Sequence, residues 1–157
     1  MPKPKPTWTE KLHRVEGYPQ VKPIDEHMSK RWGTGTMVIP APTEVDELMR
    51  QVPAGKVTTV NEIRAALARR HGATIACPIT TGIFGWIAAH AAEEQRQKGA
   101  VGITPYWRTL KTGGLLNEKY PGGIEAQKLA LESEGHVVVR KGKSFVVQNY
   151  ELVIAKL

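Results

Sequence analysis

The sequence predicts a mainly α-helical, winged helix-turn-helix domain with a small C-terminal β-hairpin. Two amphipathic helices within residues 59–97 are joined by a short turn at Gly72, which is typical of a helix-turn-helix unit. The valine-rich segments 137–139 and 145–147 flank Lys141-Gly142-Lys143 and are typical of a β-hairpin. A basic hairpin that follows a helix-turn-helix is the arrangement of a winged helix.

Residues 1–42 are predicted to form an irregular N-terminal extension that packs on the domain of residues 43–157. The extension is rich in proline and glycine and has no sustained hydrophobic period, and its start, residues 3–6, is expected to be extended and solvated. Its apolar residues, Trp8 among them, are too many for a free tail. A short strand is expected at 36–39.

Capping residues set the expected bounds of the first two helices of the domain. The first helix is expected over 44–51, with Thr43 as its N-cap. The second begins at Thr59, which has Glu62 as its capping-box partner, and ends at Gly72.

Two further helices are expected after Gly72. The third runs from about residue 79 to residue 97, with Pro78 at its entry and Thr80 or Thr81 as its cap. Another helix covers 124–134 and leads into the hairpin.

The charge of the chain points to an anionic partner. Lysine and arginine total 22 against 15 acidic residues, which gives a net charge of +7 and a pI near 9.6. A spread positive field of this size attracts polyanions, and nucleic acid is the commonest of these in a cytoplasm. The N-terminus lacks the apolar core of a signal peptide, and no apolar run is long enough to span a bilayer. We therefore expect a cytoplasmic protein that does not bind a membrane.

Metal and thiol chemistry have little support in the sequence. The five histidines show no ligand spacing, so neither a metal nor another cofactor is expected. Cys77 is the single cysteine, which excludes an internal disulfide. Its position before Pro78 leaves two roles open: a nucleophile favoured by a helix N-terminus, or a small buried apolar residue.

The order of motifs from residue 43 to residue 136 resembles the C-terminal DNA-binding domain of alkylguanine-DNA alkyltransferases. The motifs that carry the resemblance are Pro53-Ala54-Gly55-Lys56-Val57-Thr58-Thr59, Pro105-x-x-Arg108, Tyr120-x-Gly-Gly and Glu134-Gly135-His136. The resemblance implies an alkyltransferase-type winged helix that binds double-stranded DNA and flips a guanine nucleotide out of the duplex.

The family's Pro-Cys-His-Arg loop reads Pro105-Tyr106-Trp107-Arg108 in this chain. Tyr106 stands where the family has its nucleophilic cysteine, and Trp107 stands where it has the histidine of the proton relay. A phenol with a pKa near 10 and no neighbouring base is a poor alkyl acceptor. We therefore predict that the chain is not an enzyme and that it is closest to the alkyltransferase-like proteins, which lack the cysteine and bind alkylated DNA.

The resemblance also implies a base pocket. Its residues would be Tyr106, Trp107, Arg108, Tyr120 and Glu134, together with Thr81 and Gly82 on the recognition helix, where Thr81 replaces the family's intercalating arginine. Tyr106 and Trp107 are interpreted either as a base-stacking pocket or as core aromatics. Arg108 is interpreted either as a phosphate contact or as a residue that orders the loop. Glu134, without its relay, is expected to bond only backbone or Tyr106.

Four basic residues are candidate phosphate contacts: Arg69, Arg70, Lys141 and Lys143. Each is otherwise a solvated surface charge. The leading hypothesis is a non-enzymatic DNA-binding protein that senses alkylated guanine in DNA repair. The alternatives are alkyl transfer or other thiol activity through Cys77, and a protein-interaction module in which residues 1–42 bind a partner and cover the DNA groove.

Overall fold

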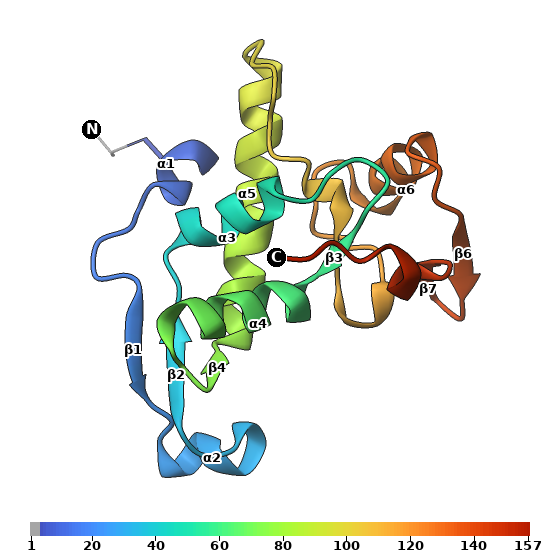
Figure 1. The fold of residues 1–157 in the computed structure, drawn as a ribbon. Coiled ribbons are helices and arrows are strands. Elements are labelled where there is room, and N and C mark those ends of the chain that lie inside the picture. The colour runs from blue at the N-terminus through green and yellow to red at the C-terminus, as the bar shows by residue number, and fades with distance from the viewer. Residues whose placement is uncertain (1–3) are drawn as a thin grey trace.

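The structure is a computed structural model that describes residues 4–157. Its centre is the long helix α5 (Pro78–Gln97), against which α1 (Trp8–Leu12), α3 (Pro42–Arg50) and α4 (Val60–His71) pack (Figure 1). The expected mainly helical architecture with small sheets is confirmed. The expectation for Lys3 lies outside the described residues.

The predicted N-cap and end of α4 are right, and the predicted N-cap of α3 is wrong. Thr59 caps α4, because its hydroxyl accepts a hydrogen bond from the Glu62 N–H at 3.3 Å, and Gly72 ends it with φ 62°. α3 begins at Pro42 rather than after Thr43, with Ala41 at the N-cap position. The Glu44 carboxylate accepts the Ala41 N–H at 3.2 Å, and proline is favoured in the first turn because it has no N–H to satisfy.

The start of α5 at Pro78 agrees with the sequence prediction, but the predicted cap is wrong. Cys77 occupies the N-cap position and gives no side-chain cap, so neither Thr80 nor Thr81 caps this helix. The helix begins at Pro78, directly after the short strand β4 (Ile75–Ala76), because that strand is held parallel to β2 (Thr36–Ile39) and fixes where the helix starts.

The N-terminal segment is more regular than the sequence predicts. It contains α1, β1 (Gln20–Pro23), α2 (Glu26–Trp32) and the expected strand β2. β2 lies between β1, to which it is antiparallel, and β4, to which it is parallel. The prediction of an irregular extension is therefore wrong for residues 8–39. The division of the chain into two parts near residue 43 stays a prediction.

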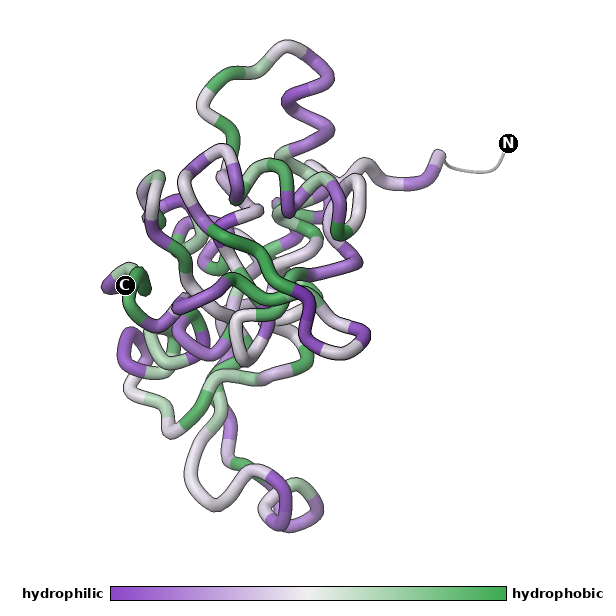
Figure 2. Tube along the Cα trace, turned by 90° about the vertical axis from the view of Figure 1, so that its right-hand side faces the viewer, coloured by the Kyte–Doolittle hydropathy of each residue, from purple (hydrophilic) through white to green (hydrophobic). Residues whose placement is uncertain are grey.

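The C-terminal part surrounds the other side of α5. β3 (Thr58–Thr59) pairs with β5 (Thr109–Leu110), and α6 (Gly123–Ser133) leads into the predicted hairpin of β6 (Val138–Lys141) and β7 (Ser144–Val147). Short 3₁₀ helices lie at Tyr106–Arg108, Thr112–Gly114 and Tyr150–Val153. The polar C-terminal end of α5 and the following loop project from the body of the molecule (Figures 1 and 2).

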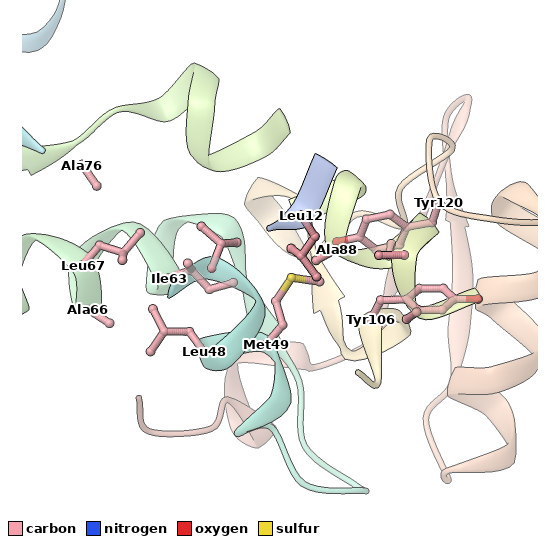
Figure 3. Packing of buried hydrophobic residues seen from close by; sticks show 14 of the residues in the cluster. Leu12, Leu48, Met49, Ile63, Ala66, Leu67, Ala76, Ala88, Tyr106 and Tyr120 are labelled. Carbon is pink, nitrogen blue, oxygen red and sulfur yellow. The ribbon is translucent and has the colours of Figure 1, made fainter. Parts of the chain in front are cut away.

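The core forms where α3, α4 and α5 meet. Met49 from α3, together with Ile63 and Leu67 from α4, is almost fully buried against a run of alanines on α5. Tyr106 and Tyr120 close the same cluster from the far side of α5 (Figure 3). None of the described helices combines the length and the hydropathy needed to cross a membrane.

Candidate functional site

Tyr106 lies in the short 3₁₀ helix Tyr106–Arg108 and is both a core residue and a pocket residue. Its side chain is only 8% exposed, and its ring meets those of Trp107 and Tyr120 edge to face at 5.4 and 5.6 Å between centroids. Figure 3 places Tyr106 and Tyr120 side by side beyond Ala88 of α5. Tyr106 is therefore a core aromatic, and its role in a base-stacking pocket stays a prediction.

A cavity of about 570 Å³ opens beside Tyr106. We call it the Tyr106 cavity, and its volume is in the range of ordinary ligand pockets. One wall is the C-terminal half of α5 and the other is α6; its lining residues are His90, Glu93, Arg96, Gln97, Ile103, Tyr106, Trp107, Pro121, Gly122, Ala126 and Ala130. The cavity thus combines an aromatic floor with a charged rim.

Burial favours the neutral form of the Tyr106 phenol. Desolvation raises the pKa of Tyr106 above its ordinary value, and the Glu93 carboxylate raises it further, although Arg96 opposes both. A neutral phenol is a weak nucleophile and a hydrogen-bond donor. Tyr106 can therefore stack on a ligand or donate a hydrogen bond to it.

Arg108 orders the loop that carries Tyr106. Its guanidinium donates to both carboxylate oxygens of Glu134, with N–O distances of 2.5 to 3.1 Å, and to the Val52 carbonyl at 2.8 Å. Trp107 Nε1 also donates to Glu134 at 3.0 Å. This geometry agrees with the loop-ordering role of Arg108 rather than with a phosphate contact.

Glu134 has different partners from those expected. It accepts from Trp107 and Arg108, so the expectation of bonds only to backbone or to Tyr106 is wrong. The prediction missed this contact because it did not consider the indole N–H of Trp107 as a hydrogen-bond donor. Burial alone would raise the pKa of Glu134, but the hydrogen bonds and the charge of Arg108 lower it below the ordinary value.

The structure separates Thr81 from Gly82. Thr81 is 1% exposed and points into the protein, so the prediction that it contacts DNA is wrong. Gly82 is half-buried, and it lies between Ile79 and Ile83, which are 59% and 36% exposed. Successive helical residues are turned by about 100°, so a shift of one position moves a side chain from the surface to the core.

The exposed first turns of α5 line a groove that also contains lysines. The groove encloses about 400 Å³ and is lined by Ile79, Gly82, Ile83, Trp86, Lys111, Asn117, Glu118 and Lys119. A neighbouring cavity of about 320 Å³ shares Lys111 and Glu118 with this groove and extends to Lys143 of the hairpin. The surface from α5 to the hairpin tip is therefore continuous.

We call Lys119, Lys111 and Lys143 the lysine row. Lys111 pairs with Glu118 at 3.0 Å, while Lys119 and Lys143 are exposed. Of these three lysines the sequence predicted only Lys143, because Lys119 lies in a turn and Lys111 in an isolated β-bridge with Leu115. Their positions beside Gly113-Gly114 and Tyr120 were the only signal that could have found them.

The other predicted phosphate contacts are differently placed. Arg70 lies within 3.9 and 4.0 Å of Glu44 and Glu47 on α3, and Arg69 donates to the Leu157 carbonyl at 3.2 Å. These arginines face α3 and the C-terminus rather than the lysine row. Lys141 is exposed beside the hairpin tip, where it pairs in register with Ser144.

Cys77 packs as an apolar side chain. It is 7% exposed and clusters with Ile24 and Met37. Tyr106 lies beside Glu93 and Arg96, near the other end of α5. Glu93 is sixteen residues after Cys77, which corresponds to about 24 Å along the helix axis. This placement fits the buried apolar role.

The N-terminal segment covers the middle of α5. Trp8 stacks on His90 with centroids 4.5 Å apart and meets Trp86 edge to face at 5.7 Å. The Glu94 carboxylate accepts the N–H groups of Trp8 and Thr9, both at 3.1 Å, and so holds the start of α1. Tyr18 also meets Phe84 edge to face at 6.3 Å, so this cover reaches the second turn of α5 but leaves Ile79 and Ile83 exposed.

The fold of this chain is similar to that of alkyltransferase-like proteins. Two solved structures share it: Schizosaccharomyces pombe (S. pombe) Atl1 in complex with damaged DNA containing O6-carboxymethylguanine, and S. pombe ATL in complex with DNA. Each has 24% identity and a TM-score of 0.53, and the match covers 74% of this chain and 94% of the other. No protein-family model and no curated protein matches the chain.

Proposed function

We propose that this protein binds double-stranded DNA and does not transfer an alkyl group from it. The observation that carries the proposal is the lysine row beside the exposed first turns of α5. Lysines spaced along one continuous face suit a phosphate backbone, which supplies most of the affinity in nonspecific binding. The fold likeness to two proteins crystallised with DNA supports the same conclusion.

The Tyr106 side chain is unsuited to alkyl transfer. Alkyl transfer from an aryl ether needs an ionisable, soft nucleophile, whereas the Tyr106 phenol is buried and protonated. Its neighbour Trp107 offers no base, and Glu134 is engaged by Arg108. The Cys77 thiol is buried near the opposite end of α5, which argues against thiol chemistry at the Tyr106 cavity.

We further propose that the Tyr106 cavity receives an alkylated guanine turned out of the duplex. Its volume of about 570 Å³ leaves room for a base, and Tyr106 and Trp107 provide aromatic faces for stacking. A protein of this kind senses damage by holding the base rather than by repairing it.

The alternative of a protein-interaction module rests on residues 1–42 covering the groove. Trp8 covers Trp86 and His90, which is the observation in favour of it. The exposure of Ile79 and Ile83 argues against it, because the cover leaves this face of α5 open.

The test is a titration of plain and O6-alkylguanine duplexes at several salt concentrations. The plot of log K against log salt should have a steep slope. Lys119→Gln and Lys143→Gln should each reduce the magnitude of this slope by about 1. The matched control Lys22→Gln, at an exposed position of β1, should leave the slope unchanged. Tyr106→Ala should reduce the preference for the alkylated duplex. Failure to bind either duplex at low salt would refute the proposal, as would transfer of a labelled alkyl group to the protein.

A further inference from the structure

The first turns of α5 expose apolar side chains where a soluble helix normally presents polar ones. Ile79 is 59% exposed and Ile83 is 36% exposed, and their spacing of four residues puts them on one face of the helix. The other large apolar residues of α5, Phe84, Trp86 and Ile87, are half-buried against the core. The two isoleucines therefore form a ridge that no described part of the protein covers.

Gly82 is a second, independent anomaly on the same face. Glycine in a helix interior weakens the helix relative to alanine, and Gly82 is in ordinary helical conformation. A Cβ atom added at Gly82 would meet no heavy atom within 4 Å, so packing inside the protein does not require glycine here. A missing side chain beside an exposed ridge allows the backbone of another molecule to approach closely.

Charge decides which molecule fits the ridge. Lys111 and Lys119 line the groove that Ile79, Gly82 and Ile83 form, and Lys143 continues the row. Lysines at the edge of an apolar ridge suit a polyanion that has an apolar interior. A DNA duplex is such a polyanion, because its stacked bases lie between two phosphate backbones. Isoleucine is among the side chains that proteins insert between base steps, where it unstacks the bases and kinks the duplex.

We infer that Ile79 and Ile83 act as an apolar wedge that opens a base step of bound DNA, while Gly82 lets the helix backbone approach the sugar-phosphate chain. The inference rests on the proposed DNA binding and adds the manner of distortion. The contacts of the lysine row with phosphates supply the binding free energy, and part of it offsets the cost of unstacking the base step.

A short duplex that carries 2-aminopurine reports the wedge, because its fluorescence rises when the base is unstacked. The unmodified protein should raise the fluorescence, and Ile79→Ala and Ile83→Ala should abolish the rise and weaken binding about tenfold with an unchanged salt slope. Leu129→Ala is the matched control, since Leu129 is 68% exposed on α6, and it should change neither measurement.

Gly82 gives a test in which stability and binding move in opposite directions. Gly82→Ala should raise Tm by about 2 to 4 °C and weaken duplex binding several-fold. Gly85→Ala, in the same helix but buried and with open space for a Cβ, should raise Tm in the same way and leave binding unchanged.

The outcomes separate this inference from the proposed function. Salt-dependent binding that survives Ile79→Ala, Ile83→Ala and Gly82→Ala unchanged would overturn the wedge and leave the DNA-binding proposal standing. Binding without a rise in 2-aminopurine fluorescence at any position of the duplex would also overturn the wedge. Absence of duplex binding would overturn both.

Discussion

Replacing Glu134 by alanine removes the centre of the network that holds the 104–108 loop. Glu134 and Arg108 have side chains only 14% and 15% exposed, so the loss leaves a largely buried guanidinium with one remaining acceptor, the Val52 carbonyl, at 2.8 Å. Trp107 Nε1 loses its acceptor as well. Breaking a buried pair costs about 3 to 5 kcal/mol, and we expect the lower end, about 3 kcal/mol, because both groups keep some contact with water.

Urea unfolding followed by tryptophan fluorescence measures this cost directly. A loss of about 3 kcal/mol corresponds to a fall in Tm on the order of 10 °C for a chain of this size. Glu132→Ala is the matched control, because Glu132 is an exposed residue in the last turn of α6, which Glu134 follows. Equal unfolding midpoints for Glu134→Ala and Glu132→Ala would refute the argument that this network stabilises the loop.

The same carboxylate gives the stability a pH dependence. The folded-state pKa of Glu134 lies below its unfolded value of about 4.3, so its contribution is complete above that pH and is lost as the pH falls through the folded pKa. The free energy of unfolding should therefore fall less steeply between about pH 5 and pH 3 in Glu134→Ala than in the unmodified protein. Parallel curves would contradict the assignment.

Three further predictions follow from local geometry. Gly114→Ala should lower the free energy of unfolding by about 3 kcal/mol or more, because φ is +80° and the new Cβ would meet the Tyr150 ring. Gly113→Ala, at φ +81° with open space around the new Cβ, should cost only the backbone strain of about 1 to 2 kcal/mol. Urea unfolding of the two variants measures the difference. Glu94→Ala should release α1, seen as faster amide hydrogen exchange in residues 8–12 with no change in α4. Cys77 should react with a thiol reagent only as fast as the protein opens, and rapid labelling in native buffer would show that it is accessible.

The helix and hairpin predictions succeeded where they rested on residues close in sequence. Thr59 with Glu62, Gly72 as a helix end and the strands around Gly142 are all local devices, and the structure contains them. The start of α3 was misplaced by two residues because Ala41 has no capping side chain to reveal it. The strand order of the N-terminal sheet was beyond prediction, since the paired positions Met37 of β2 and Ile75 of β4 are thirty-eight positions apart in the sequence.

The sequence by itself determined the chemistry available at the site. It placed a phenol at position 106 and an indole at position 107, and it kept the single thiol elsewhere in the chain. Only the tertiary structure decided which residues share a surface. It buried Thr81 and left Gly82 half-buried, paired Glu134 with Arg108, and placed Lys111, Lys119 and Lys143 around two adjoining cavities. The physical reason is that side-chain type is a local property, whereas exposure and proximity depend on how distant segments pack around α5.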